Sequence, residues 1–80
     1  MDLARGIHES RYKQLIEALA EARRNAGVTQ TELAAKLGRR QQFVSKYESG
    51  ERRLDVVEFT DICRSLGLDA AGLVGGIAPS

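Results

Sequence analysis

The basic side chains of this sequence are concentrated in one stretch, residues 23–53. That stretch holds eight Lys and Arg and three Glu, a net charge of 8 − 3 = +5, whereas the rest of the chain carries four basic and eight acidic side chains, 4 − 8 = −4. Because the whole chain has a net charge of only +1, this separation indicates one basic face on a neutral body. Within the stretch stand side chains whose types can bond to the edges of adenine and guanine: Arg40, Gln41, Gln42 and Lys46.

Residues suited to catalysis or metal binding are scarce. The chain has one histidine, His8, and one cysteine, Cys63, too few for a Ser-His-Asp set or a four-ligand zinc site. Cys63 is predicted to be a small buried hydrophobe. We therefore expect a protein that is not an enzyme and that uses no metal and no other cofactor. No ligand-sensing domain follows in the sequence, so no small-molecule ligand is expected.

The elements that must position the basic stretch show the apolar spacing of helices, and no strand-like alternation persists. The pattern predicts an all-α fold with helices over about 11–26, 29–37, 40–49, 55–66 and 69–74, most of them followed by glycine. The inward positions are predicted to be Tyr12, Leu15, Leu19, Leu33, Ala34, Leu37, Val44, Ile62 and Leu66. Val56 and Val57 are placed on the apolar side of the fourth helix.

Capping residues predict where the helices begin. Thr29 and Asp55 each have a glutamate three residues later, the pattern of a capping box. Ser10 and Asp69 are predicted to cap the first and the last helix. Residues 1–9 are then a flexible N-terminal lead-in, residues 10–75 the folded domain, and residues 76–80 a flexible tail.

Length and composition narrow the class of protein. Eighty residues allow one domain, and 42% hydrophobic with 29% charged residues is the balance of a soluble globular chain. The sequence has no apolar run near the ~18 residues that span a bilayer, and its first residues lack the apolar stretch of a secretory signal. A cytoplasmic location is expected.

Two short helices joined by a turn at Gly38 are typical of a helix-turn-helix. From Leu19 to Leu73 the sequence resembles the Cro/repressor-type (XRE-like) helix-turn-helix family. The matching residues are Arg23, Gly27-Val28-Thr29-Gln30, Glu32-Leu33-Ala34, Leu37-Gly38, Val44-Ser45-Lys46-Tyr47-Glu48, Gly50 and Leu66-Gly67. The resemblance implies a compact five-helix bundle, the lambda-repressor-like DNA-binding domain, over residues 10–75. It implies a sequence-specific regulator of transcription that binds double-stranded DNA with its third helix in the major groove.

The resemblance also gives individual residues a role. Base contacts are expected from the start of the third helix and one turn later, at Arg40, Gln41, Gln42 and Lys46. Phosphate contacts are expected from the start of the second helix and from the ends and flanking loops of the third, at Gln30, Arg39, Ser49, Arg52 and Arg53. Arg23 and Glu48 resemble the structural ion pair of the family. Relatives pair through the C-terminal region, which implies a homodimer on an inverted-repeat operator with an interface at Leu68, Leu73, Val74 and Ile77.

Three positions depart from the family pattern. Arg40 stands where the family often has a capping Ser or Thr, and Leu54 stands where many relatives have proline. Phe43 replaces a small residue, and it either packs beside Tyr47, the favoured reading, or touches a thymine methyl group. A protein-interaction module of the same fold that has lost DNA binding is the alternative function. Within DNA binders, the size fits a phage Cro-like repressor, a restriction–modification controller and an antitoxin equally.

Overall fold

The computed structural model describes residues 3–77 of the chain, with side chains from residue 10 onward. This part of the chain is all helical, without strands, which confirms the predicted fold class. The helices are α1 (Leu3–Asn25), α2 (Gln30–Leu37), α3 (Gln41–Ser49), α4 (Val56–Leu66) and α5 (Ala70–Gly75). None of these five helices is both long and apolar enough to cross a membrane. The parts of the predicted lead-in and tail at residues 1–2 and 78–80 lie outside the described residues.

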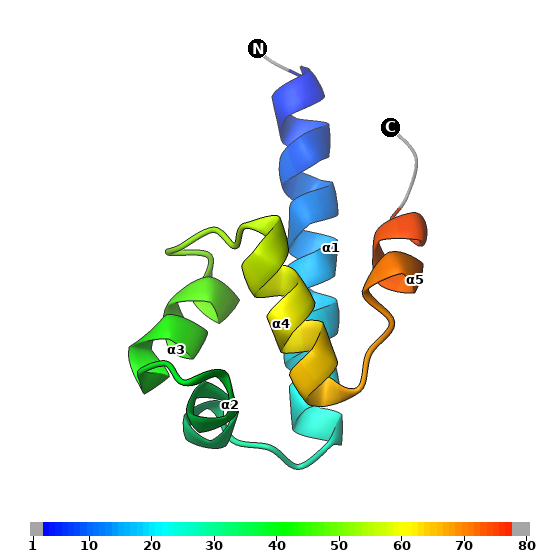
Figure 1. The fold of residues 1–80 in the computed structure, drawn as a ribbon. Helices are drawn as coiled ribbons and strands as arrows, with labels where there is room; N and C mark the ends of the chain where they lie inside the picture. The colour runs from blue at the N-terminus through cyan, green and yellow to red at the C-terminus, as the bar shows by residue number, and fades with distance from the viewer. Residues whose placement is uncertain (1–2, 78–80) are drawn as a thin grey trace.

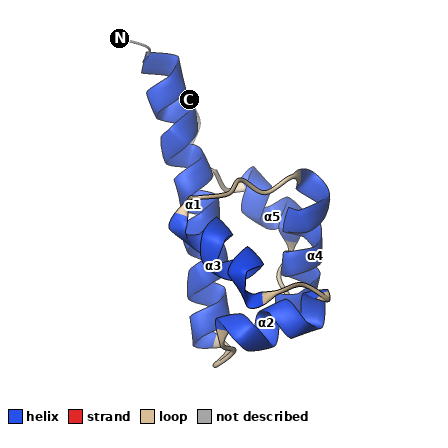
Figure 2. Cartoon of the chain, turned by 90° about the vertical axis from the view of Figure 1, so that its left-hand side faces the viewer, coloured by secondary structure: helices blue, strands red, loops and turns tan. Residues whose placement is uncertain are grey.

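The long helix α1 forms the axis of the molecule, and its first turns extend beyond the other helices (Figure 1). Helix α2 packs against α3 and α4, while α1 contacts both α3 and α4. Helix α5 packs against α4. Helices α3 and α5 lie on opposite sides of the bundle (Figure 1), and the view turned by 90° looks at the molecule from the side of α3 (Figure 2). The face that carries α3 is therefore separate from the face that carries α5.

The core lies where α1, α2, α3 and α4 meet. Its buried residues are Ile16, Leu19, Leu33, Ala34, Val44, Tyr47, Phe59, Ile62 and Cys63. Tyr12, Leu15, Leu37 and Leu66 are partly buried and pack against this cluster, so every predicted core position contributes to it. Burying each large side chain stabilises the fold by about 1.5–3 kcal/mol, which is the main reason why helices this short are stable.

Two of the helices, α2 and α4, begin with the predicted capping boxes. The Thr29 hydroxyl accepts a hydrogen bond from the Glu32 N–H at 3.0 Å, and the Glu32 carboxylate accepts one from the Thr29 N–H at 2.9 Å. The same reciprocal box joins Asp55 to Glu58 at the start of α4. Helix α3 begins at Gln41, and Arg40 at its N-cap position makes no side-chain capping hydrogen bond, as expected where an arginine stands in place of Ser or Thr. Between α2 and α3, Gly38 has φ +67°, a conformation that side chains with a Cβ disfavour.

Two predicted caps are wrong. Helix α1 begins at Leu3, so Ser10 lies inside the helix and caps nothing, and the segment predicted to be a lead-in is helical from Leu3 onward. Asp69 occupies the N-cap position of α5, but its side chain accepts no hydrogen bond from the helix. Ser favours cap positions without being confined to them, so Ser10 did not locate the start of α1. Asp69 did locate the start of α5, but it makes no capping hydrogen bond there.

The placement of Val56 and Val57 on the buried side of α4 is also wrong. Their side chains are 76% and 65% exposed. The buried stripe of α4 contains Ile62, and one turn before Ile62 stands Glu58, which is buried. Val57 stands five residues before Ile62, and that spacing turns its side chain off the stripe. The buried position one turn before Ile62 is therefore taken by the acidic residue of the capping box and not by either valine.

Candidate nucleic-acid interface

Helix α3 is fixed by its inner face and exposed along its outer face. Val44 and Tyr47 are fully buried, whereas the candidate base readers all lie at the surface. Those readers are Arg40, Gln41, Gln42 and Lys46. Gln42 and Lys46 are one turn apart and so share a face of the helix. The structure therefore brings polar hydrogen-bonding side chains together at the exposed start and middle of α3.

A chain of polar contacts links the start of α3 to α1. Arg23 of α1 donates to both carboxylate oxygens of Glu48, from Nε at 2.7 Å and from Nη2 at 3.0 Å. Gln30, the first residue of α2, donates from Nε2 to Glu48 Oε1 at 2.9 Å. Gln41, the first residue of α3, donates from Nε2 to Gln30 Oε1 at 3.2 Å. The amide of Gln41 is thus oriented through three helices.

The Arg23–Glu48 pair at the root of this chain is largely withdrawn from water. The two side chains are 11% and 9% exposed, and Arg23 also donates to the Val28 carbonyl at 2.9 Å. The hydrogen bonds to Glu48 raise the pKa of Arg23 above its ordinary value. A bidentate pair of this kind has one preferred geometry, so it sets the position of α3 against α1.

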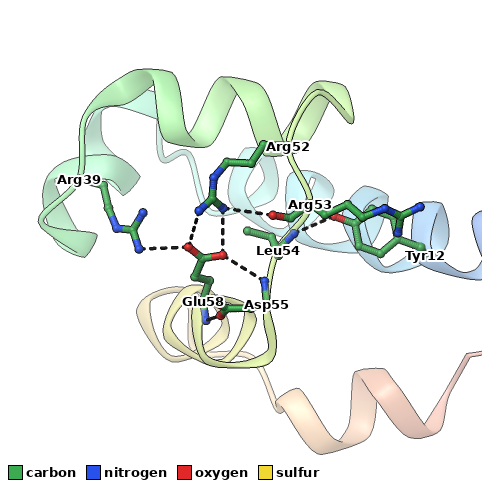
Figure 3. A network of polar contacts seen from close by, with 7 residues as sticks. All are labelled: Tyr12, Arg39, Arg52, Arg53, Leu54, Asp55 and Glu58. Carbon is green, nitrogen blue, oxygen red and sulfur yellow. Dashed lines mark hydrogen bonds and ion pairs between the residues drawn. The ribbon is translucent and has the colours of Figure 1, made fainter.

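A second polar cluster surrounds Glu58 of α4 (Figure 3). Arg52 donates from Nη1 and Nη2 to the two oxygens of Glu58 at 2.9 and 2.8 Å, and Arg39 donates from Nη2 to Glu58 Oε2 at 3.1 Å. Both guanidinium groups also lie over the ring of Phe43, at 4.3 Å for Arg39 and 4.9 Å for Arg52. The hydrogen bonds from Arg52, followed by that from the Asp55 N–H, lower the pKa of Glu58 to about 2.

Phe43 itself packs inward. It is partly buried against the core cluster, with its ring centre 5.5 Å from that of Tyr47. Of the two readings that the sequence left open, the structure shows the packing one, in which the ring supports two arginines instead of facing outward.

The loop between α3 and α4 directs its neighbouring arginines to different partners. Arg52 points toward Glu58, whereas Arg53 lies over the ring of Tyr12 on α1, at 4.5 Å (Figure 3). The Tyr12 hydroxyl accepts a hydrogen bond from the Leu54 N–H at 3.1 Å. A proline at position 54 has no N–H to donate. Leu54, where the resemblance led us to expect proline, therefore makes a hydrogen bond that ties the loop to α1.

Ser49 and the predicted dimer residues are also placed by the structure. The Ser49 hydroxyl donates to the Lys46 carbonyl at 3.1 Å at the exposed end of α3. Leu68 and Leu73 pack partly buried against the core, and Ile77 is half-buried. Val74 is 52% exposed. The proposed interface residues therefore divide into an inner set and an outer one.

An apolar groove adjoins the exposed Val74. Its lining comes from α1, from the start of α4 and from α5: Tyr12, Leu15, Ile16, Leu54, Asp55, Val56, Phe59 and Val74. One of these lining residues, Val56, was placed by the sequence pattern on the apolar side of the fourth helix. The apolar surface near α5 is thus wider than the C-terminal residues alone.

Sequence reasoning missed the second role of Glu58 and the polar role of Tyr12. Glu58 carried a capping signal, and Tyr12 was assigned to the core without a hydrogen bond. Their partners, Arg39 and Leu54, are 19 and 42 residues away along the chain. No local pattern connects such positions. In the described part of the chain, no group of three or more His, Cys, Asp and Glu side chains is arranged to hold a metal ion.

A family model described as helix-turn-helix matches residues 19–73. The chain belongs to the XRE-type helix-turn-helix family. A solved structure described as an XRE-family like protein, from Pseudomonas syringae pv. tomato, is 52% identical with a TM-score of 0.91, and the match covers 96% of this chain and 94% of that one. A relative named uncharacterized HTH-type transcriptional regulator y4dJ, from Sinorhizobium fredii, is 36% identical over 55 residues, 69% of this chain and 71% of the relative.

Membership of this family fixes which helices form the motif. Helices α2 and α3 are the two helices of the helix-turn-helix, and the matched region runs from the middle of α1 to α5. The contacts of Gln30, Gln41 and Glu48 therefore lie inside the motif. Arg23 and Glu58 connect it to α1 and α4, respectively.

Proposed function

We propose that this chain is a cytoplasmic, non-enzymatic regulator of transcription that binds double-stranded DNA in a sequence-specific manner. Helix α3 enters the major groove, and two copies bind an inverted-repeat operator. The family match and the relative named as a transcriptional regulator support DNA binding by a regulator. The remaining details rest on the geometry of α3 and its surroundings.

The observation that carries the proposal is the orientation of Gln41. Its amide stands at the exposed start of α3 and is oriented by Gln30, which is itself bound to Glu48. A glutamine amide that offers a donor and an acceptor side by side can bond to the major-groove edge of adenine. Gln42 lies beside it at the surface. An amide that is already oriented binds a base more tightly than a mobile one, because less rotamer entropy is lost on binding.

The neighbouring basic residues complete the base-reading set. Arg40 and Lys46 are both exposed on α3 or immediately before it, and their cationic side chains suit the guanine acceptors O6 and N7. An acidic or apolar outer face on α3 would favour the alternative, a protein-interaction module. The face observed here carries amides and cations.

Backbone contacts are assigned to residues around the edge of α3. They are Gln30, Arg39, Ser49, Arg52 and Arg53. Gln30 lies at the N-terminus of α2, where free N–H groups favour a phosphate. Phosphate contacts position the protein and carry no sequence information of their own. These residues should therefore affect all DNA alike.

A homodimer follows from the size of one binding unit. A single helix reads few base pairs, so two copies related by two-fold symmetry are needed for a specific site. The interface is proposed at Leu68, Leu73, Val74 and Ile77, and Val74 is its exposed member. Since α5 lies on the side of the bundle opposite to α3 (Figure 1), pairing there leaves both copies of α3 free. Half-sites should lie about one helical turn, roughly 34 Å, apart.

Selection of bound duplexes from a random pool tests the proposal. The expected result is an enriched inverted repeat with two equal half-sites. Gln41→Ala and Gln42→Ala should each lower operator affinity by roughly ten- to a hundredfold, the equivalent of about 1–3 kcal/mol. Both variants should leave the affinity for scrambled duplex nearly unchanged. Arg53→Ala is the matched comparison, because loss of a phosphate contact should weaken binding to both duplexes equally.

The outcomes separate the candidate functions. No enrichment, together with a binding constant for duplex that does not change with salt, would favour the protein-interaction module. If both glutamine variants lost the two affinities equally, or lost neither, base reading would move from Gln41 and Gln42 to Arg40 and Lys46.

A further inference from the structure

Two arginines from opposite ends of α3 meet on one carboxylate. Arg39 precedes α3 and Arg52 follows it, yet both donate to Glu58 Oε2, at 3.1 and 2.8 Å. Arg52 also reaches Glu58 Oε1 at 2.9 Å and the Arg53 carbonyl at 3.1 Å. Both guanidinium groups stack on the ring of Phe43. We call Arg39, Arg52, Glu58 and Phe43 the arginine cluster.

The arginine cluster stays cationic and open to solvent. Two guanidinium groups and one carboxylate give 2 − 1 = +1. The side chains of Arg39 and Arg52 are 44% and 40% exposed, whereas that of Glu58 is 10% exposed. A guanidinium carries five N–H donors, and Glu58 takes one from Arg39 and two from Arg52. Donors on both arginines therefore remain for an anion from outside.

We propose that Glu58 is a positioning residue for DNA binding: it holds Arg39 and Arg52 together as a two-arginine clamp for the phosphates that flank α3. The inference rests on the proposed function. Without the carboxylate, two cations placed this close together would repel each other and each would sample many rotamers. With it, the repulsion is offset and the ordering of two long side chains is complete before DNA arrives.

The change in DNA affinity that we expect on neutralising Glu58 is opposite in sign to the change that net charge alone predicts. An acid on a surface that binds a polyanion should weaken binding, so its neutralisation should strengthen binding to all DNA. If Glu58 orders the arginines, its neutralisation weakens binding instead. If Glu58 serves only the α4 cap and the fold, the affinity of the folded protein for DNA does not depend on its charge.

The test is a titration of a fluorescent duplex of arbitrary sequence, which needs no knowledge of the operator. Glu58→Gln keeps the side-chain length and an oxygen that can accept the Asp55 N–H, but it removes the charge. We expect three- to tenfold weaker binding and a salt dependence reduced by about one unit, as for the loss of a phosphate contact. Glu51→Gln is the matched control, because Glu51 is an exposed acid next to Arg52. It should bind the same duplex as well as the parent or more tightly.

A second variant changes the position of the carboxylate without changing the net charge of the protein. Glu58→Asp keeps the carboxylate but withdraws it by one methylene, too far to bond both arginines in their present positions. If only net charge matters, Glu58→Asp should bind duplex DNA as tightly as the parent protein does. If Glu58 positions the two arginines, Glu58→Asp should bind it more weakly. Circular dichroism establishes that each variant is folded before titration, and Glu58→Asp alone decides the question if Glu58→Gln does not fold.

The possible failures are distinguishable. If the parent protein shows no salt-dependent binding to duplex, the proposed function itself fails. If the parent binds but Glu58→Gln binds equally or more tightly, or Glu58→Asp binds equally, the positioning role of Glu58 is overturned while the proposed function stands.

Discussion

Removal of the Arg23 guanidinium with Glu48 left in place should destabilise the fold by about 3 kcal/mol. Loss of one partner from a buried ion pair costs about 3–5 kcal/mol, and the lower end applies because about a tenth of each side chain is exposed. For 80 residues, a stability of about 0.05–0.15 kcal/mol per residue gives about 4–12 kcal/mol in total. Arg23→Met should therefore remove a quarter or more of the stability.

The second half of this prediction concerns the pair as a unit. Arg23→Met combined with Glu48→Leu removes both charges and leaves no buried ion without a partner. It also loses the contacts to Val28 and Gln30, each worth about 0.5–1.5 kcal/mol. The double variant should still be more stable than the sum of the two single losses predicts, because the charges are coupled.

Urea unfolding followed by circular dichroism measures these losses. With a slope near 1–1.5 kcal/mol/M, roughly that of a small domain, Arg23→Met should lower the midpoint by about 2–3 M. A loss below about 1 kcal/mol for this variant, or additive losses in the double variant, would refute the reasoning. The double variant should also show reduced preference for operator over scrambled duplex while folded, because Gln30 has lost the acceptor that orients it and Gln41.

The remaining predictions concern binding, acid stability, pairing and the α3–α4 loop. Affinity for duplex DNA should fall roughly a thousandfold or more between about 50 and 200 mM salt for a dimer with about 6–10 phosphate contacts. A binding constant that barely changes over this range would argue against a DNA-binding role. The pKa of Glu58 is lowered from 4.5 to about 2 in the folded protein, so its contribution to stability is present above about pH 4.5 and is lost as the pH falls toward 2. The urea midpoint should drop over that range, and it should drop less in Glu58→Gln. Val74→Asp should weaken dimerisation in sedimentation experiments without unfolding the monomer, because this side chain is half exposed; an unchanged dimer would exclude Val74 from the interface. Tyr12→Phe should cost about 0.5–1.5 kcal/mol in urea unfolding, since it leaves the Leu54 N–H without its acceptor, and an unchanged midpoint would show that this bond contributes nothing.

The parts of the fold that could be predicted depend on partners close together in the sequence. The Thr29 box was predictable because its partner stands three residues later, and the turn at Gly38 because a single residue type suits its φ. The beginning of α1 was not predictable from Ser10 alone. A serine inside a helix costs only a few tenths of a kcal/mol, about the average for its class, so a helix can continue through a good capping residue.

The features of the site that the sequence did not predict are contacts between residues far apart in the sequence. The sequence placed Glu58 at a helix start and Arg39 and Arg52 on loops, and each of these positions is where the structure has it. Their meeting depends on how α3 and α4 are each held against α1 and α2. The exposure of Val57 is a separate matter, because it follows from the spacing of Val57 from Ile62 within α4.

Two carboxylates, those of Glu48 and Glu58, hold the polar and basic side chains around α3 in place. On a surface that binds a polyanion, an acid lowers affinity unless it does something that the cations cannot do for themselves. Glu48 joins Arg23 to Gln30 and so orients Gln41, while Glu58 joins Arg39 to Arg52. One carboxylate thus acts on a residue proposed to read bases, and the other on residues proposed to bind phosphates. Neutralisation of Glu48 should therefore reduce discrimination between sequences, whereas neutralisation of Glu58 should reduce affinity for all of them.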